Sequence, residues 1–151
     1  MRTLAPPDPH FERRLRSSFA RMKLMETIGA KLTTALPGEV EIELPFRSDL
    51  TQHHGFVHAG IVTSIVDTAC GYAALTLLPA NAEVLTVEYK VNFVSPATGT
   101  RMIGRGRVTK PGRRLTVCAG DVFAVGEGKE KLVAIMLATM MGLPERAGPA
   151  E

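Results

Sequence analysis

The chain has 151 residues, a formal net charge of +3 and 45% hydrophobic residues, which suits a single domain spanning residues 1–151. The basic excess is small, the Lys and Arg residues are scattered and Trp is absent, so nucleic acid is a poor partner and a small anionic ligand a better one. No apolar run is long enough for a membrane helix and no signal-peptide pattern is present, so we expect no membrane partner and a cytoplasmic setting.

The first predicted element is an amphipathic helix that follows a Pro-rich leader ending near Pro9. Its apolar residues recur at helical spacing: Phe11, Leu15, Phe19, Met22 and Met25. The arginines between them are expected to face water. Two short strands are predicted within residues 29–44, on either side of a turn at Pro37-Gly38. Residues 1–9 and 144–151 are expected to be loose termini.

A second helix is predicted from Gly60 to Leu78, after a polar loop over residues 47–57. It is apolar around most of its circumference, which indicates that other elements cover it. A narrow stripe at three-to-four-residue spacing is small and polar, and contains Gly60, Ser64, Asp67 and Gly71. Because a carboxylate in a buried helix costs free energy unless it has a role, Asp67 marks a candidate site.

Four strands are predicted after this helix, over residues 85–93, 101–109, 114–125 and 131–141. The last strand is apolar on both faces, which predicts a central position in the sheet. The apolar surface of this helix must be buried, and a long antiparallel sheet buries it when the sheet curls around the helix. We therefore predict an α+β hotdog fold: a curved antiparallel sheet wrapped around one long buried helix, with an N-terminal amphipathic helix.

Two segments resemble the PaaI-type acyl-CoA thioesterases of the hotdog-fold superfamily. They are Gln52-His53-His54-Gly55-Phe56-Val57-His58-Ala59-Gly60, followed by Asp67, and the strand from Thr86 to Pro96. The family motif is His-Gly-Gly with an acidic residue nine positions after the His and Asn or Gln six before it. His58, Asp67 and Gln52 stand at those positions. Ala59 replaces the first Gly, and because the family uses the backbone N–H of that residue, a small Ala can serve.

The resemblance covers residues 25–143, about four-fifths of the chain, and implies an activity and an assembly. The activity is hydrolysis of a small acyl-CoA thioester, aromatic ones included, to the free acid and coenzyme A. No cofactor is implied, since coenzyme A is part of the substrate. The assembly is a homodimer, often paired again into a homotetramer. Thr86 matches a family position that lines the acyl site.

The residues also permit this chemistry without the family. The N–H groups of Ala59 and Gly60 at the helix start are predicted to donate to the thioester carbonyl. Asp67 is predicted to act either as general base toward water or as a nucleophile that forms an anhydride, and both alternatives stay open. Gln52 is predicted to orient water or hold the thioester. His58 is expected to pack at the helix start and contact the substrate.

The spacing between these groups predicts a shared site. Asp67 lies seven to eight residues beyond Ala59 and Gly60, which is roughly 10–12 Å along a helix and too far for both to contact one carbonyl. Two such helices packed antiparallel about a two-fold axis would place Asp67 of one copy beside the helix start of the other. We therefore expect a homodimer with two equivalent active sites.

Other side chains carry weaker predictions. Lys90, Arg105, Arg113 and Arg114 are candidate ligands for the phosphates of coenzyme A, with plain solvation as the alternative. His53, His54 and His58 have no neighbouring cluster of acids or cysteines, so no metal site is predicted. Cys70 and Cys118 lack metal or redox spacing and are expected to be small core residues.

Three alternatives to the catalytic interpretation stay open. Asp67 alone could be a structural carboxylate bonded to backbone. A non-catalytic protein of the same fold could bind acyl-CoA without hydrolysing it. A hydratase or dehydratase would need a His and an acid placed as a proton-shuttle pair, a pattern that His58 and Asp67 do not show.

Overall fold

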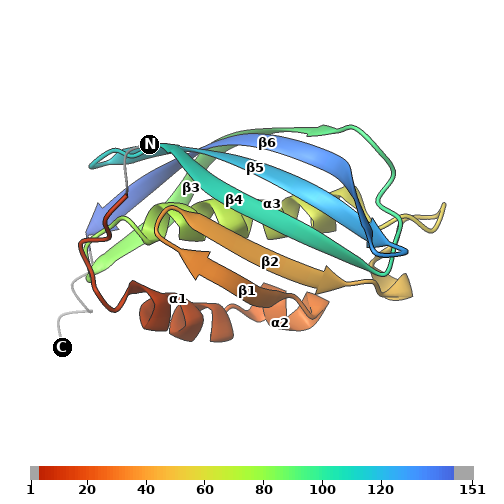
Figure 1. Ribbon diagram of the computed structural model, residues 1–151, viewed down its shortest axis with the longest axis horizontal. Helices are drawn as coiled ribbons and strands as arrows, with labels where there is room; N and C mark the ends of the chain where they lie inside the picture. The colour runs from red at the N-terminus through yellow and green to blue at the C-terminus, as the bar shows by residue number, and fades with distance from the viewer. Residues whose placement is uncertain (1–3, 145–151) are drawn as a thin grey trace, which may run out of the picture.

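A computed structural model describes residues 4–144 (Figure 1). Two short helices, a pair of strands and a short 3-10 helix precede the long helix, and four strands follow it. In chain order the elements are α1 (Phe11–Ala20), α2 (Lys23–Ile28), β1 (Lys31–Leu36), β2 (Glu39–Pro45), η1 (Ser48–Leu50), α3 (Ala59–Leu75), β3 (Ala82–Phe93), β4 (Arg101–Lys110), β5 (Leu115–Gly126) and β6 (Lys129–Pro144).

The strands form one antiparallel sheet in the order β1-β2-β4-β5-β6-β3, and this sheet curls around α3 (Figure 1). The predicted α+β hotdog fold is confirmed. β6 has a strand on each side, as its apolar character predicted. Its face toward α3 is buried at Met136 and Ala138, whereas Ile135 and Leu137 on the outer face are exposed. The apolar outer face of β6 is therefore uncovered in the single chain.

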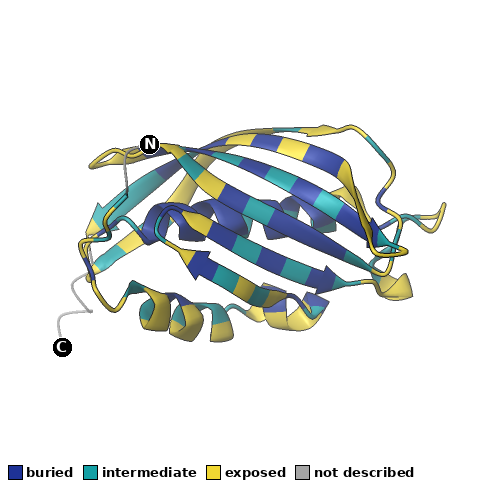
Figure 2. Cartoon of the chain, viewed as in Figure 1, coloured by how far each residue is buried: buried dark blue, intermediate teal, exposed yellow. Residues whose placement is uncertain are grey.

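The core lies between the concave face of the sheet and α3, which is buried over most of its length (Figure 2). α3 begins one residue before the predicted start and ends at Leu75, after which residues 76–78 form a turn. Glycines in the sheet let the helix approach closely. A Cβ on Gly106 of β4 would lie 2.3 Å from the backbone carbon of Ala69. The position of α3, and hence of Asp67, depends on this contact.

Gly106→Ala should therefore destabilise the protein strongly. The added methyl group would overlap helix backbone, which cannot rotate away as a side chain can, so we expect a loss of about 3 kcal/mol in the free energy of unfolding. Gly126→Ala at the end of β5 is the matched control, because its Cβ would meet only the Cα of Gly99, at 3.8 Å. Urea unfolding of both variants checks this, and equal stability would contradict the close-packing argument.

The N-terminal part differs from its prediction in three ways. The single amphipathic helix is divided, because Met22 is extended and separates α1 from α2. Arg14 does not face water: its guanidinium donates to the carbonyls of Leu75 and Leu78, 3.2 Å away at the end of α3. Asp8 is buried and forms an ion pair with Arg14 at 3.1 Å, so the leader is anchored at Asp8. The remaining predicted loose ends, residues 1–3 and 145–151, lie outside the described residues.

Candidate active site

Asp67 lies in the middle of α3 and faces β3. Its Oδ1 accepts a hydrogen bond of 2.8 Å from the hydroxyl of Thr86, which itself lies 3.5 Å from the sulfur of Met140. Burial raises the pKa of Asp67 above its usual range, and the hydrogen bond from Thr86 opposes that shift. A half-buried carboxylate with one neutral donor and a raised pKa is suited to taking up a proton.

The start of α3 is capped by His58. The ring Nδ1 accepts a 2.8 Å hydrogen bond from the N–H of Gly60, and the His58 carbonyl accepts from Ile61 and Val62. Within the described part of the chain, the N–H of Ala59 makes no hydrogen bond. Of the two donors predicted from the sequence, that of Gly60 is thus occupied by the cap, and that of Ala59 is available to a ligand. The structure places His58 in a capping role that its sequence position alone did not reveal.

Gln52 lies beside this helix start. Its side-chain oxygen accepts a hydrogen bond from the backbone N–H of His54, which leaves its amide NH₂ as a donor. Gln52 and Ala59 both line a cavity of about 190 Å³ that also contacts Phe93. The structure therefore brings the predicted water-positioning group and the available amide donor together.

Asp67 and Thr86 line a different cavity, of about 240 Å³, between α1, α3 and β3. The two cavities share no lining residue. The structure thus assembles the predicted site residues into two halves, Gln52 with Ala59 and Asp67 with Thr86, and a single chain does not join them.

The edge of β3 shows what could join the halves. β3 pairs only with β6, so its other edge is open within the described residues. Tyr89 and Phe93 stand opposite the buried residues Ala138 and Ala134, and so belong to the face of the sheet that carries α3. Their side chains are nevertheless 45% and 49% exposed. Large apolar residues on the helix side of an open strand need a cover that the chain does not supply.

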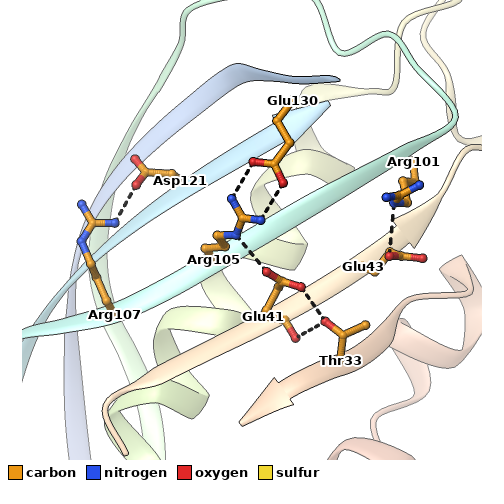
Figure 3. A network of polar contacts seen from close by, with 8 residues as sticks. All are labelled: Thr33, Glu41, Glu43, Arg101, Arg105, Arg107, Asp121 and Glu130. Carbon is orange, nitrogen blue, oxygen red and sulfur yellow. Dashed lines mark hydrogen bonds and ion pairs between the residues drawn. The ribbon is translucent and has the colours of Figure 1, made fainter. Parts of the chain in front are cut away.

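The candidate phosphate ligands lie apart from both cavities. Arg105 is engaged in an ion network on the outer face of the sheet, with Glu130 at 2.7 Å and Glu41 at 2.8 Å (Figure 3). These partners raise the pKa of Arg105 and use its donors, so it is a poor candidate for phosphate binding. Two further ion pairs flank the network: Arg107 with Asp121 and Arg101 with Glu43.

Lys90, Arg113 and Arg114 have different surroundings. Lys90 stands opposite Leu137 on the outer face of the sheet. Arg113 and Arg114 flank a cavity of about 570 Å³ beside Leu78, which follows the end of α3. None of these basic residues lines the cavity of Asp67 or that of Ala59.

The comparisons with known proteins identify the family of the chain. A sequence model described as the thioesterase superfamily matches residues 54–131, more than half of the chain, including the helix start and Asp67. The chain belongs to the thioesterase superfamily. A structure of a thioesterase family protein from Silicibacter pomeroyi is 50% identical, with a TM-score of 0.87, and the match covers 89% of this chain and 98% of that one.

Other similar proteins are more distant. A provisionally named esterase of Saccharolobus solfataricus is 30% identical over 107 residues, 71% of this chain and 75% of that one. Another, from Halobacterium salinarum, is 35% identical over 81 residues, so the match spans 50% of this chain and 54% of that relative. The PaaI protein of Escherichia coli, from the phenylacetic acid degradation operon, shares the fold with a TM-score of 0.80 at 15% identity, over 89% of this chain and 94% of that one.

Some features of this candidate site were not predicted. Ser18, Met22 and Tyr72 line the cavity of Asp67, although each reads in the sequence as part of an ordinary amphipathic or buried helix. In the sequence, the one indication of this cavity was Gly71, a glycine inside a helix. Within residues 4–144, no group of three or more His, Cys, Asp or Glu side chains is arranged to hold a metal, and no helix could cross a membrane.

Proposed function

We propose that the protein is a cytoplasmic acyl-CoA thioesterase that hydrolyses a small acyl-CoA to the free acid and coenzyme A. The observation that carries the proposal is the half-buried carboxylate of Asp67, held by Thr86 in an otherwise apolar helix of a thioesterase-superfamily chain. The available N–H of Ala59, at the positive end of the same helix, supports it.

The chemistry follows from these two groups. The Ala59 N–H donates to the thioester carbonyl oxygen and stabilises the negative charge that develops there. Asp67 then acts in one of two ways. As general base it takes a proton from water, whose oxygen attacks the carbonyl carbon. As nucleophile its own oxygen attacks and forms an anhydride that water hydrolyses afterwards. In both, the carbon–sulfur bond breaks and coenzyme A leaves as the thiolate.

We propose further that two copies share each site. Asp67 and Ala59 are eight residues apart in α3, about 12 Å along the axis, and line separate cavities. A second copy placed along the open edge of β3 would continue the sheet, cover Tyr89 and Phe93, and bring its own α3 antiparallel to the first. Each Asp67 would then face the Ala59 of the other copy, with Gln52 beside it. Further pairing into a homotetramer is part of the proposal.

The pH dependence of the reaction should depend on Thr86. The ionised form of Asp67 is the active one, so kcat/KM falls as pH drops through its pKa, which burial has raised. The Thr86 hydroxyl stabilises the ionised form and lowers that pKa. Thr86→Val removes the donor, so the acid limb of the kcat/KM profile should move to higher pH. Thr86→Ser, which keeps a hydroxyl, is the control, and an unmoved limb in the Val variant would contradict the role of this hydrogen bond.

A turnover assay tests the function itself. The wild-type protein is mixed with a panel of acetyl-, hexanoyl-, benzoyl- and phenylacetyl-CoA, and released thiol is measured. We expect hydrolysis of at least one member without added metal. Binding of the panel without any release of thiol would instead identify an acyl-CoA-binding protein.

A further inference from the structure

Arg14 of α1 contacts the segment that joins α3, which carries Asp67, to β3, which carries Thr86. We propose that Arg14 is a positioning residue of the active site: its guanidinium fixes the start of β3 against the end of α3 and so keeps the Thr86 hydroxyl on Asp67. The inference rests on the proposed function, in which Asp67 is the reacting carboxylate. It gives a role in the reaction to α1, which lies outside residues 54–131, the part that matches the superfamily.

The guanidinium of Arg14 is surrounded by backbone carbonyls. Its Nη2 donates to Leu75 and Leu78, each at 3.2 Å. Its Nη1 lies 2.9 to 3.3 Å from three further carbonyl oxygens, those of Pro79, Ala80 and Ala82. Carbonyls at the end of a helix lack partners within the helix and carry partial negative charge, which a cation stabilises. Because Leu75 ends α3 and Ala82 begins β3, this one side chain bonds to both ends of the connection between them.

Arg14 is itself held in place from its other side. Its Nε forms an ion pair of 3.1 Å with Asp8, which is only 5% exposed. The second carboxylate oxygen of Asp8 accepts a 2.8 Å hydrogen bond from the backbone N–H of His10. One turn further along α1, the Ser18 hydroxyl accepts from the Tyr72 hydroxyl of α3 at 3.0 Å. The guanidinium therefore has a fixed counter-ion, and the helix that carries it is bonded to α3.

A β-bulge makes the position of Thr86 depend on the start of β3. The register between β3 and β6 shifts between Thr86 and Glu88, so Val87 is the extra residue of a bulge. Thr86 and Tyr89 consequently lie on the same face of the sheet although they are three residues apart. A bulge disrupts the ladder locally and changes the direction of a side chain. The direction of Thr86 is therefore set by residues 82–86, and Arg14 bonds to the first of them.

The contacts of Arg14 adjoin the candidate site without entering it. A small cavity of about 70 Å³ beside Arg14 shares Ser18, Leu75 and Glu83 with the larger cavity of Asp67. Arg14 does not line that larger cavity. It therefore acts through the position of β3 and not by contact with the reacting groups.

The pH dependence of kcat/KM distinguishes positioning from stability alone. Arg14→Lys keeps the positive charge, but one ammonium group cannot reach all five carbonyls. The start of β3 should then shift, the hydrogen bond from Thr86 to Asp67 should weaken, and the acid limb of the profile should move to higher pH. We expect kcat/KM on this limb, relative to the plateau, to fall by about threefold or more, the size expected from weakening one hydrogen bond. A side chain that only stabilises the fold would lower Tm and leave this ratio unchanged. Arg16→Lys is the matched control, because its guanidinium donates to the carbonyl of Leu32 in β1.

A double variant shows whether the effect of Arg14 passes through Thr86. Once Thr86→Val has removed the hydroxyl, adding Arg14→Lys should move the acid limb no further. The other ionisable groups on the cavity walls are Glu83 of β3 and Tyr72 of α3, and among the described residues α1 contributes none. If the limb moved because Glu83 came closer to Asp67, the shift caused by Arg14→Lys would persist in the Thr86→Val protein, and the proposal would be overturned.

Asp8→Asn is a milder variant that decides the question if Arg14→Lys does not fold. It removes the ion pair with Arg14 but keeps a side-chain oxygen for the N–H of His10, so the limb should move in the same direction by a smaller amount. A profile that stays unmoved in the variants that fold would overturn the proposal. If the wild type hydrolyses no thioester, the proposed function fails instead. A ¹³C NMR titration of the Asp67 carboxyl then tests the positioning: its pKa should be higher in Arg14→Lys than in the wild type, and equal values would contradict it.

Discussion

Asp67→Asn should lower the turnover of acyl-CoA by about a hundredfold or more with little loss of substrate binding. Asn has the same shape, and its side-chain oxygen can still accept from Thr86, so the geometry seen at 2.8 Å is kept while the base or nucleophile is lost. The measurements are kcat from steady-state thiol release and the dissociation constant of the thioester by calorimetry. Turnover near that of the wild type would remove Asp67 from the mechanism.

The same variant should be more stable than the wild type at neutral pH. The pKa of Asp67 is raised in the folded protein, mainly by burial. The folded state therefore holds the proton more tightly than the unfolded state, and the stability linked to it is lost as pH rises through the folded pKa. The Asn side chain has no proton to lose in this pH range, so its burial does not lower the free energy of unfolding as pH rises. The difference in Tm should be positive at pH 7 and should shrink below the ordinary Asp pKa, about 3.9. An unstable variant would instead make Asp67 a structural carboxylate.

Turnover in ¹⁸O-labelled water tests for the nucleophilic role of Asp67 through the label in its side chain. With Asp67 as general base, labelled oxygen goes directly to the acid product. With Asp67 as nucleophile, the position of the label depends on which carbon of the anhydride water attacks. Attack on the acyl carbon labels the acid product, as in the general-base route, whereas attack on the carboxyl carbon of Asp67 leaves the first acid product unlabelled and puts the label into the peptide that contains Asp67. Label recovered in that peptide by mass spectrometry after repeated turnover indicates the anhydride.

The fold was predictable because the strongest patterns belong to the elements that bury the most surface. An apolar helix around Asp67 and four alternating strands allow few arrangements. The division between α1 and α2 was not predictable from periodicity, since Phe11 to Met25 keep helical spacing across the break at Met22. The burial of Arg14 was also hidden, because its partners are backbone carbonyls more than sixty residues away.

The candidate site was predictable only as a set of residues. The spacing of Gln52, His58 and Asp67 identified it, and helix geometry showed that Asp67 and Ala59 cannot meet within one chain. Which of the two amides is available depended on the side-chain rotamer of His58, whose Nδ1 occupies the N–H of Gly60. The walls of the cavity likewise depend on where α1 docks, and no local pattern near Ser18 specifies that.

Ala59→Pro should abolish activity without disturbing the fold, because it removes one donor at a position where proline is well tolerated. Ala59 is the first residue of α3, the preferred helical position of Pro. His58 before it is extended, with φ −58° and ψ 138°, as a residue preceding Pro should be. The lost N–H makes no hydrogen bond within the described chain. We expect a fall in kcat of about a hundredfold or more, whereas Ala59→Gly, which keeps the N–H, should retain activity.

Complementation between the two inactive variants then tests the shared site. In a heterodimer of Asp67→Asn and Ala59→Pro chains, one site combines the intact Asp67 of the second chain with the intact Ala59 amide of the first. The other site has neither group. Heterodimers isolated through two different affinity tags should therefore recover about half of the wild-type activity per dimer, although each homodimer is inactive. If each site were built within one chain, every chain would lack one essential group, and verified heterodimers would stay as inactive as their parents.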